Sequence, residues 1–293
     1  MEAIRTVGLT KYYGRTRGIE RVSLTVDQGD FFGFIGPNGA GKSTLIRTLL
    51  GLIRPTGGQA QVLGLDVGRD RVKILERVGY LPAETAFWPG MRVRELLRLS
   101  AGLRRKDCRR EADRLCRRLE LDAAGKAEEL SLGNRKKAAI VCALQHEPDL
   151  LILDEPTSGL DPLVQREFFH ILRERSARGV TVFFSSHILS EVQRSCSHAA
   201  VIRDGAIVAS GSVESLSRAG GRRVSFRGQA QVAALAGVRD VRLWEDGAAF
   251  LYSGDMQPLL AALARGRIQD LTISEPDLEE AFLRLSRERG REE

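Results

Sequence analysis

The sequence predicts an α/β fold built on a buried and mostly parallel sheet, followed by a smaller α+β domain. Residues 32–50 read as the end of a buried strand, a glycine-rich loop at residues 36–43 and the first turns of a helix. Residues 150–155 are four apolar residues followed by two carboxylates, which is typical of a buried parallel strand with acids at its carboxyl end. Beyond residue 211 the pattern changes to short strand-like and helical segments.

The glycine-rich loop carries the pattern G-x-x-x-x-G-K-[ST] between a strand and a helix, which is the context that this pattern requires. Gly36, Gly39 and Gly41 allow backbone N–H groups to converge on phosphate oxygens at a helix N-terminus, which already favours anions. Lys42 can reach the outer phosphates of a nucleotide, and the Ser43 hydroxyl can bind Mg²⁺. An ordinary glycine turn would not need the whole pattern, so the sequence predicts a nucleotide site here.

The acids at the end of the second predicted strand suit the same chemistry. Asp154 is placed to orient Mg²⁺ or its water, and Glu155 to accept a proton from an attacking water. The alternative, an Asp-Glu pair that starts a helix, is disfavoured by the phosphate loop upstream. A third apolar strand, residues 180–186, ends at His187, and the pattern alone leaves open whether this histidine is structural or part of the site.

Composition argues against a membrane-spanning or nucleic-acid-binding chain. No apolar run approaches the length of a membrane span, and the N-terminus lacks the apolar core of a signal peptide, so a cytoplasmic chain is expected. The net charge of +7 is concentrated in residues 104–118. We expect a solvated helix face with local ion pairs there, and no nucleic-acid partner, because no aromatic residues interleave the charges. The four cysteines lack metal-ligand spacing and are expected to be buried thiols.

The remaining elements follow from periodicity and turn residues. Strands are expected at 4–9, 22–26 and 60–63, helices at 72–78 and 136–145, helical periodicity over 92–121, and a hairpin at 201–208. The tail is expected to contain a Gly/Arg linker at 218–223, a hairpin at 238–252, a helix at 259–263, a strand at 268–273 and a final helix that opens at Ser274.

Together these motifs resemble the ATP-binding subunit of an ABC (ATP-binding cassette) transporter. The glycine-rich loop is similar to the family's Walker A loop, with Gly36, Pro37, Asn38, Gly39, Ala40, Gly41, Lys42, Ser43 and Thr44. Residues 150–155 resemble Walker B with Glu155 as the catalytic glutamate, and His187 matches the switch histidine that contacts the γ-phosphate. Tyr13 matches the aromatic residue that stacks on adenine, and Asp161 lies in the counterpart of the D-loop. The family's signature position is occupied by Ser131, Leu132, Gly133 and Asn134.

The resemblance implies a P-loop NTPase cassette with a RecA-like, mostly parallel sheet and antiparallel β and helical subdomains. The cassette is expected at residues 1–215, its helical subdomain at about 92–148, and a C-terminal α+β accessory domain at 216–293. It implies that two copies close head to tail around two ATP molecules with Mg²⁺, each signature contacting the nucleotide of the other copy. It also implies a separate integral membrane permease of the multidrug or antibiotic-resistance exporter type, with this chain on the cytoplasmic face and Phe87 and Trp88 contacting the permease.

Two features depart from the family pattern. Leu132 and Asn134 replace a glycine and a glutamine of the signature, and Ala83 stands where the family has a glutamine that orders Mg²⁺ and water. Ala83 suggests slow hydrolysis or loose coupling, although Glu84 is adjacent. The alternative function is therefore a slow or inactive ATP-dependent regulatory clamp. A long coiled-coil insertion, a second phosphate loop and an Asn-Lys-x-Asp motif are absent from the sequence, which disfavours DNA-repair, translation-factor and GTPase relatives.

Overall fold

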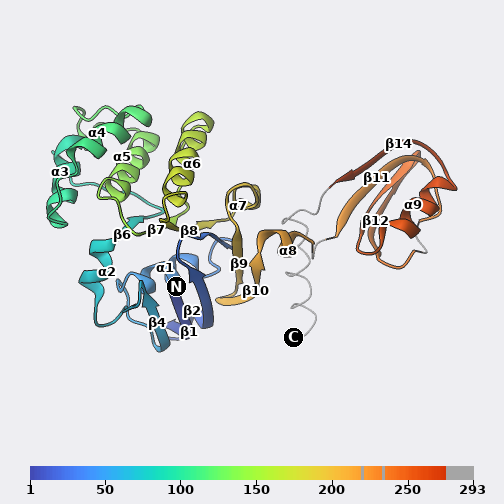
Figure 1. The fold of residues 1–293 in the computed structure, drawn as a ribbon, viewed down its shortest axis with the longest axis horizontal. Coiled ribbons are helices and arrows are strands. Elements are labelled where there is room, and N and C mark those ends of the chain that lie inside the picture. The colour runs from blue at the N-terminus through green and yellow to red at the C-terminus, as the bar shows by residue number, and fades with distance from the viewer. Residues whose placement is uncertain (219–220, 233–234, 275–293) are drawn as a thin grey trace. The chain divides into compact units, whose positions relative to one another are not determined.

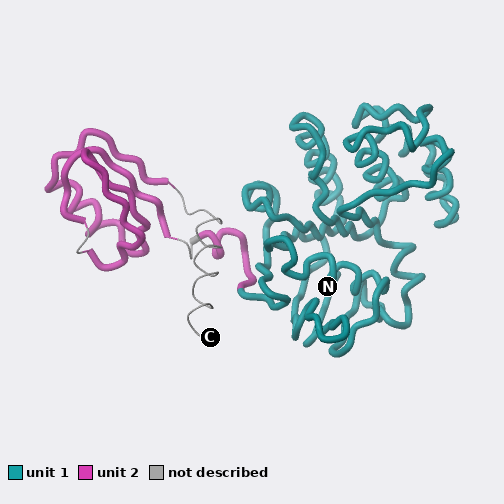
Figure 2. Tube along the Cα trace, turned by 180° about the vertical axis from the view of Figure 1, so that it is seen from behind, with its two compact units in different colours: residues 1–208 teal, residues 209–293 magenta. Residues whose placement is uncertain are grey.

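The computed structural model describes residues 1–218, 221–232 and 235–274, and the chain divides into two compact units, residues 1–208 and 209–293 (Figures 1 and 2). The domain boundary expected after residue 215 is a few residues further along the chain than this division. Every residue of the predicted nucleotide site belongs to the first unit.

A six-stranded sheet forms the centre of the first unit, in the order β10-β9-β3-β8-β7-β6. Its strands are β3 (Phe31–Ile35), β6 (Val78–Leu81), β7 (Leu150–Asp154), β8 (Thr181–Ser186), β9 (His198–Arg203) and β10 (Ala206–Ser212). The neighbours from β9 to β6 pair in parallel. All residues of β3, β7 and β8 are buried, because helices or a second sheet cover both faces. The predicted α/β fold class is confirmed.

An antiparallel sheet lies beside this one, with strand order β2-β1-β4-β5. Its strands are β1 (Glu2–Tyr13), β2 (Thr16–Asp27), β4 (Gly57–Val62) and β5 (Leu65–Asp66). The side chains of β2 alternate between buried and exposed toward its end, so one face of the sheet packs on the core. The strands expected at 4–9 and 22–26 are confirmed, and both extend further than their apolar alternation indicated.

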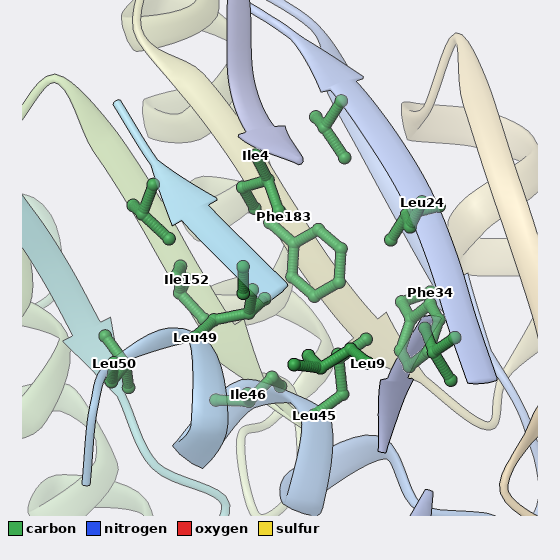
Figure 3. Close-up of a cluster of buried hydrophobic side chains, with 14 of the residues drawn as sticks. Ile4, Leu9, Leu24, Phe34, Leu45, Ile46, Leu49, Leu50, Ile152 and Phe183 are labelled. Carbon is green, nitrogen blue, oxygen red and sulfur yellow. The ribbon is translucent and has the colours of Figure 1, made fainter. Parts of the chain in front are cut away.

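Helix α1 (Lys42–Leu49) is packed between the two sheets (Figure 3). The buried cluster takes side chains from the antiparallel sheet, from α1 and from the central sheet, including Ile4, Leu9, Leu24, Leu45, Ile46, Leu49, Phe34, Ile152 and Phe183. Removing each such side chain from water stabilises the fold by about 1.5–3 kcal/mol. The core therefore fixes the start of α1, and with it the loop that precedes the helix.

The other helices of the first unit cover the central sheet or gather at one end of it (Figure 1). They are α2 (Arg71–Arg77), α3 (Val93–Leu103), α4 (Arg109–Arg118), α5 (Leu132–Leu144), α6 (Pro162–Ser176) and α7 (Leu189–Ser195). Helices α3 and α4 both pack against α5, within the region expected to be a helical subdomain. The helix expected to begin at Lys136 begins at Leu132, because the Ser131 hydroxyl caps it by accepting the Asn134 N–H.

Three arginines of the basic stretch around α4 form ion pairs with carboxylates. Ion pairs join Arg109 to Asp107, Arg114 to Glu111, and Arg118 to Glu167 and Glu174 of α6. The local pairs agree with the expected charged helix face, whereas the link from α4 to α6 was not predicted. The exposed pair of Arg109 and Asp107 contributes little to stability, because solvent screens it.

The second unit contains a four-stranded antiparallel sheet in the order β12-β13-β11-β14. Its elements are α8 (Val213–Arg218), β11 (Arg222–Gln229), β12 (Val238–Trp244), β13 (Gly247–Tyr252), α9 (Met256–Ala264) and β14 (Arg267–Ser274). The predicted hairpin, helix and last strand are confirmed.

Two expectations in this unit need correction. The linker expected at 218–223 runs into β11, an inner strand whose Val224 and Phe226 alternate into a core with Phe250. Ser274 ends β14, and the helix expected after it lies outside the described residues.

In the described part of the chain, no helix has the length and apolarity needed to cross a membrane. The four cysteines are free thiols, as expected, and three of them are buried.

Candidate functional site

The carboxyl ends of four neighbouring strands meet at one edge of the central sheet. In the register of the sheet, Ile35 of β3 is opposite Ser186 of β8, and Asp154 of β7 is opposite Ser185. Leu81 of β6 is opposite Leu153 of β7. The phosphate loop, the acids, the histidine and the turn after β6 therefore leave the sheet side by side, where open α/β sheets bind ligands.

Two glycines of the loop are required by close backbone approaches. A Cβ on Gly36 would lie 2.5 Å from the Ile202 carbonyl oxygen of β9. A Cβ on Gly41 would lie 2.5 Å from the Gly18 carbonyl oxygen, and Gly41 has a φ of +106°. Helix α1 starts directly after Gly41 with no side-chain cap and no acid in its first turn. Its first N–H groups are therefore available to an anion.

Lys42 lies across this loop with its side chain only 6% exposed. Its Nζ donates to the Gly36 carbonyl at 2.6 Å and to the Pro37 carbonyl at 3.2 Å. The same Nζ is 3.1 Å from Oε1 of Glu155, an ion pair between the loop and the end of β7. The ammonium is thus held at the point where phosphate oxygens would meet the loop.

Glu155 occupies an unusual position. Its φ of +45° places a non-glycine residue in the left-handed region, a strain that persists where the surroundings impose it. Its Oε2 is 2.6 Å from Nδ1 of His187. Its Oε1 is buried, and although it is within ion-pair distance of Lys42, it accepts no hydrogen bond from the described residues. The structure therefore brings Lys42, Glu155 and His187 together around a carboxylate oxygen that can accept a proton.

Asp154 is 1% exposed and is held by Ser185, a residue that sequence reasoning did not single out. The Ser185 hydroxyl donates to Oδ1 of Asp154 at 2.7 Å and accepts the N–H of Glu155 at 3.2 Å. One serine therefore fixes both acids, and its only sequence signal is a small polar residue at the end of an apolar strand. The Ser43 hydroxyl and the Asp154 carboxylate are hard oxygen donors, which is the chemistry that Mg²⁺ prefers.

Substitution of Ser185 by Ala is expected to lower nucleotide hydrolysis about 10-fold or more, as loss of outer-shell support commonly does. The reason is that Asp154 loses a buried hydrogen-bond donor, while the Glu155 N–H keeps only its 3.3 Å bond to the Ser185 carbonyl. Steady-state turnover measured across Mg²⁺ concentrations tests this, with the largest deficit expected at low Mg²⁺. Ser197→Ala is the matched control, because Ser197 also bonds an aspartate, Asp30, beside the start of β3. Equal turnover in both variants would contradict the assignment.

Tyr13 is the last residue of β1 and is 46% exposed. A Cβ on Gly18 would lie 3.0 Å from the Tyr13 ring and 2.9 Å from the Thr44 methyl group, so both side chains approach one point beside the start of α1. Lys11 Nζ is 5.2 Å from the centre of the Tyr13 ring. The partly exposed ring of Tyr13 therefore lies beside the phosphate loop.

The signature residues lie at the start of α5, and Leu132 is 65% exposed. Leu132 packs near Gly159, where an added Cβ would be 3.1 Å from the leucine. Asp161 caps α6 by accepting the N–H groups of Leu163 and Val164, which hold its pKa below its usual value. Within the described chain, the hydrogen bonds and ion pairs of the signature do not reach the phosphate loop.

The turn after β6 contains Ala83, the residue that departs most from the family pattern. Ala83 is half-buried, and Lys136 of α5 donates to the carbonyls of Pro82 and Ala83, a contact that the sequence did not indicate. Phe87 is half-buried and Trp88 is 69% exposed, so only the tryptophan presents most of its surface.

Comparisons with known proteins agree with this geometry. Residues 19–158 match the family model described as ABC transporter. The chain is 33% identical to the bacitracin transport ATP-binding protein BcrA of Bacillus licheniformis, with 96% of each chain covered. It is 32% identical to the linearmycin resistance ATP-binding protein LnrL of Bacillus subtilis, covering 97% of this chain and 98% of that protein. The solved structure of an ATP-binding subunit of an ABC transporter superposes with a TM-score of 0.70 at 29% identity, over 74% of this chain and 92% of that one. The chain therefore belongs to the ABC transporter family, as one of its ATP-binding ATPase subunits.

Proposed function

We propose that two copies of this chain close around two ATP molecules with Mg²⁺ and hydrolyse them to drive export through a separate integral membrane permease. The observation that carries the proposal is the convergence of Lys42, Asp154, Glu155 and His187 beside an uncapped helix N-terminus. An anion-binding loop next to a proton acceptor is suited to phosphoryl transfer to water.

The binding roles follow from the loop and its neighbours. The Lys42 ammonium and the backbone N–H groups of residues 36–44, except Pro37, which has none, bind the phosphates, while the partly exposed Tyr13 ring stacks on adenine. Ser43 and Asp154 hold Mg²⁺, which offsets the phosphate charge when bound. The bond of Asp154 to Ser185 keeps this carboxylate aimed at the edge of the sheet.

The hydrolytic roles belong to Glu155 and His187. Glu155 accepts the proton of the water that attacks the γ-phosphorus, and the bond from that phosphorus to the β-phosphate oxygen breaks to leave ADP and phosphate. His187 Nδ1 orients the Glu155 carboxylate, and its 49% exposed side chain can contact the γ-phosphate.

The second copy supplies the signature. The start of α5, with Ser131 as cap and the exposed Leu132 beside it, offers a helix N-terminus to the γ-phosphate of the opposite copy. Leu132 and Asn134 change the shape of that surface relative to the family pattern but leave its backbone N–H groups in place. Asp161 caps α6 two residues after Gly159, which lies next to Leu132 of the signature.

Export is supported by the relatives, whose names refer to bacitracin transport and linearmycin resistance and which align over almost the whole chain. An exporter for antibiotic-like compounds places this chain on the cytoplasmic face of the membrane, attached through its permease. The exposed Trp88, with Phe87 beside it, suits a docking site, because exposed aromatic residues are frequent interface anchors.

Trp88→Ala is expected to weaken permease binding about 30-fold, the size of a typical interface hot spot, and to leave the ATPase rate of the isolated chain unchanged. The test combines the purified chain with a candidate multi-span permease in lipid vesicles. It measures binding and the stimulation of ATP hydrolysis. Trp244→Ala, which alters another partly exposed tryptophan, is the control and should bind as wild type. Wild-type binding by Trp88→Ala would refute the docking role, and failure of the wild-type chain to bind would count against the permease.

The regulatory clamp remains the second candidate because residue 83 carries only a methyl group near the acids, and the neighbouring Glu84 is exposed. A clamp would bind ATP and dimerise without turnover. The ATP turnover of the wild-type chain and of Glu155→Gln distinguishes a clamp from a motor, because only a motor has turnover to lose.

A further inference from the structure

Lys136 is a charged side chain in an unusual place. It lies one turn into α5, its side chain is only 3% exposed, and no carboxylate forms an ion pair with it among the described residues. Its Nζ instead donates to the Pro82 carbonyl at 3.1 Å and to the Ala83 carbonyl at 3.0 Å. Burying an ammonium is costly unless hydrogen bonds compensate it, so two carbonyls aimed at one Nζ form a specific contact.

The contact joins two segments that meet at the edge of the site. Pro82 and Ala83 follow β6, whose last residue Leu81 is opposite Leu153 of β7, directly before the two acids. The other end of the contact is α5, which begins beside Ser131 in the signature. A displacement of α5 is therefore passed to the turn that flanks the acids.

The electrostatic surroundings of Lys136 agree with this location. Burial lowers the pKa of Lys136 to about 8, and the negative charges of Asp154 and Glu155 act against that shift. Both acids are therefore close enough to favour the protonated lysine. Ala83 brings no polar side chain of its own, so the backbone carbonyls are the groups through which this turn is held.

We propose that Lys136 is a positioning residue for ATP hydrolysis, tying the Pro82–Ala83 turn to the signature helix so that the turn and the acids of β7 move with α5. This inference rests on the proposed function, because it assigns a way in which the signature helix and the hydrolytic site are coupled. Lys136 acts through the turn and is not assigned a contact with the nucleotide.

Three variants of the full chain test the tether. Lys136→Met keeps a flexible, unbranched side chain that is one atom shorter and has no donors, and Lys136→Gln keeps N–H donors without charge. Lys106→Met is the matched control, because Lys106 Nζ also donates to a backbone carbonyl, that of His146, at 3.0 Å. His146 contacts Val78 at the start of β6, at the opposite end of the strands from the two acids. For each variant, the measurements are kcat and KM for ATP, the affinity for a non-hydrolysable ATP analogue, the thermal midpoint, and deuterium uptake over residues 82–86.

Lys136→Met is expected to lower kcat about 10-fold while KM and analogue affinity stay within about 2-fold, because misplacement of a catalytic region affects the chemical step. Uptake over residues 82–86 should rise. Lys136→Gln should retain more kcat than Lys136→Met, because it keeps N–H donors for the two carbonyls on a side chain one atom shorter than lysine. Lys106→Met should match the wild type in every measurement on the hydrolytic site.

Two results would overturn the inference. One is wild-type kcat and uptake in Lys136→Met. The other is a parallel fall of kcat, analogue affinity and thermal midpoint in both Lys136 variants, which would mean a general packing role. If Lys136→Met does not fold, Lys136→Leu replaces it as the variant without donors, with the same expected loss of kcat at unchanged analogue affinity. A wild-type chain without ATPase activity would count against the proposed function instead, and the uptake comparison would still decide whether the tether exists.

Discussion

Glu155→Gln is expected to reduce ATP turnover by about 10²–10⁴-fold, the usual contribution of a general base, while the variant still binds ATP. The substitution keeps the size of the side chain and removes the charge that accepts the proton. It also removes the ion pair with Lys42, whose Nζ lies 3.1 Å from Oε1, so the lysine is freed for phosphate and ATP affinity should stay equal or increase. The measurements are steady-state phosphate release, equilibrium binding of ATP, and size-exclusion chromatography in ATP to detect the dimer.

Glu147→Gln is the matched control for this experiment. Glu147 also has a positive φ, of 51°, and precedes β7 at the opposite end of that strand. The same change of side chain at the same type of backbone position should leave turnover unaffected. Wild-type turnover in Glu155→Gln would eliminate Glu155 as the base. A wild-type complex that binds ATP, dimerises and never hydrolyses it, even with its membrane partner, would favour the regulatory clamp.

Lys42→Met is expected to weaken ATP binding about 10- to 100-fold, because a hydrogen bond to a charged group contributes about 1.5–3 kcal/mol. The lysine is buried against the loop, and its bonds to the Gly36 and Pro37 carbonyls hold the ammonium where phosphates are expected. Equilibrium binding of ATP to the purified variant measures the effect. Lys73→Met, which breaks an exposed ion pair with Asp70, should bind ATP as wild type.

The Lys42 variant also carries a stability consequence. Loss of the ammonium leaves Glu155, 16% exposed, without its cation, so the thermal midpoint should fall as well. Adding Glu155→Gln removes the uncompensated charge and should restore much of the midpoint but none of the ATP affinity. A double-mutant cycle on thermal unfolding detects this coupling. Additive effects on the midpoint would show that the two side chains do not stabilise one another.

The parts of the proposed site that the sequence indicates most directly are those whose residues are contiguous in sequence. The phosphate loop unites its glycines, lysine and helix start within one segment, and Asp154 and Glu155 end a single apolar run. Local geometry decides such features, since a strand end, a tight glycine turn and a helix N-terminus need no distant partner to be recognised. Their convergence also follows from the rule that parallel strands present their carboxyl ends at one edge.

Other features were misjudged because tertiary pairing overrides local composition. The arginines and glycines at 218–223 indicated a linker, yet β11 pairs with both β13 and β14 and buries Val224 and Phe226 between its polar residues. Likewise α5 begins at Leu132, because the Ser131 cap extends the helix beyond its apolar periodicity. Strand pairing and capping each provide hydrogen bonds for backbone groups, whereas sequence periodicity reflects only the apolar side chains.

The sequence by itself determined the family, which the comparisons confirm, and it predicts the phosphate loop and the acids, because each depends on residues that are neighbours along the chain. Only the tertiary structure decided how those acids are held, since Ser185 is 31 positions from Asp154 and Lys136 is 53 positions from Ala83. The sequence does not show which residue will form a hydrogen bond with a serine at the end of a strand or with a lysine in a helix. The fold decides the partner, because a polar group that is buried away from water must form its hydrogen bond with another group of the protein.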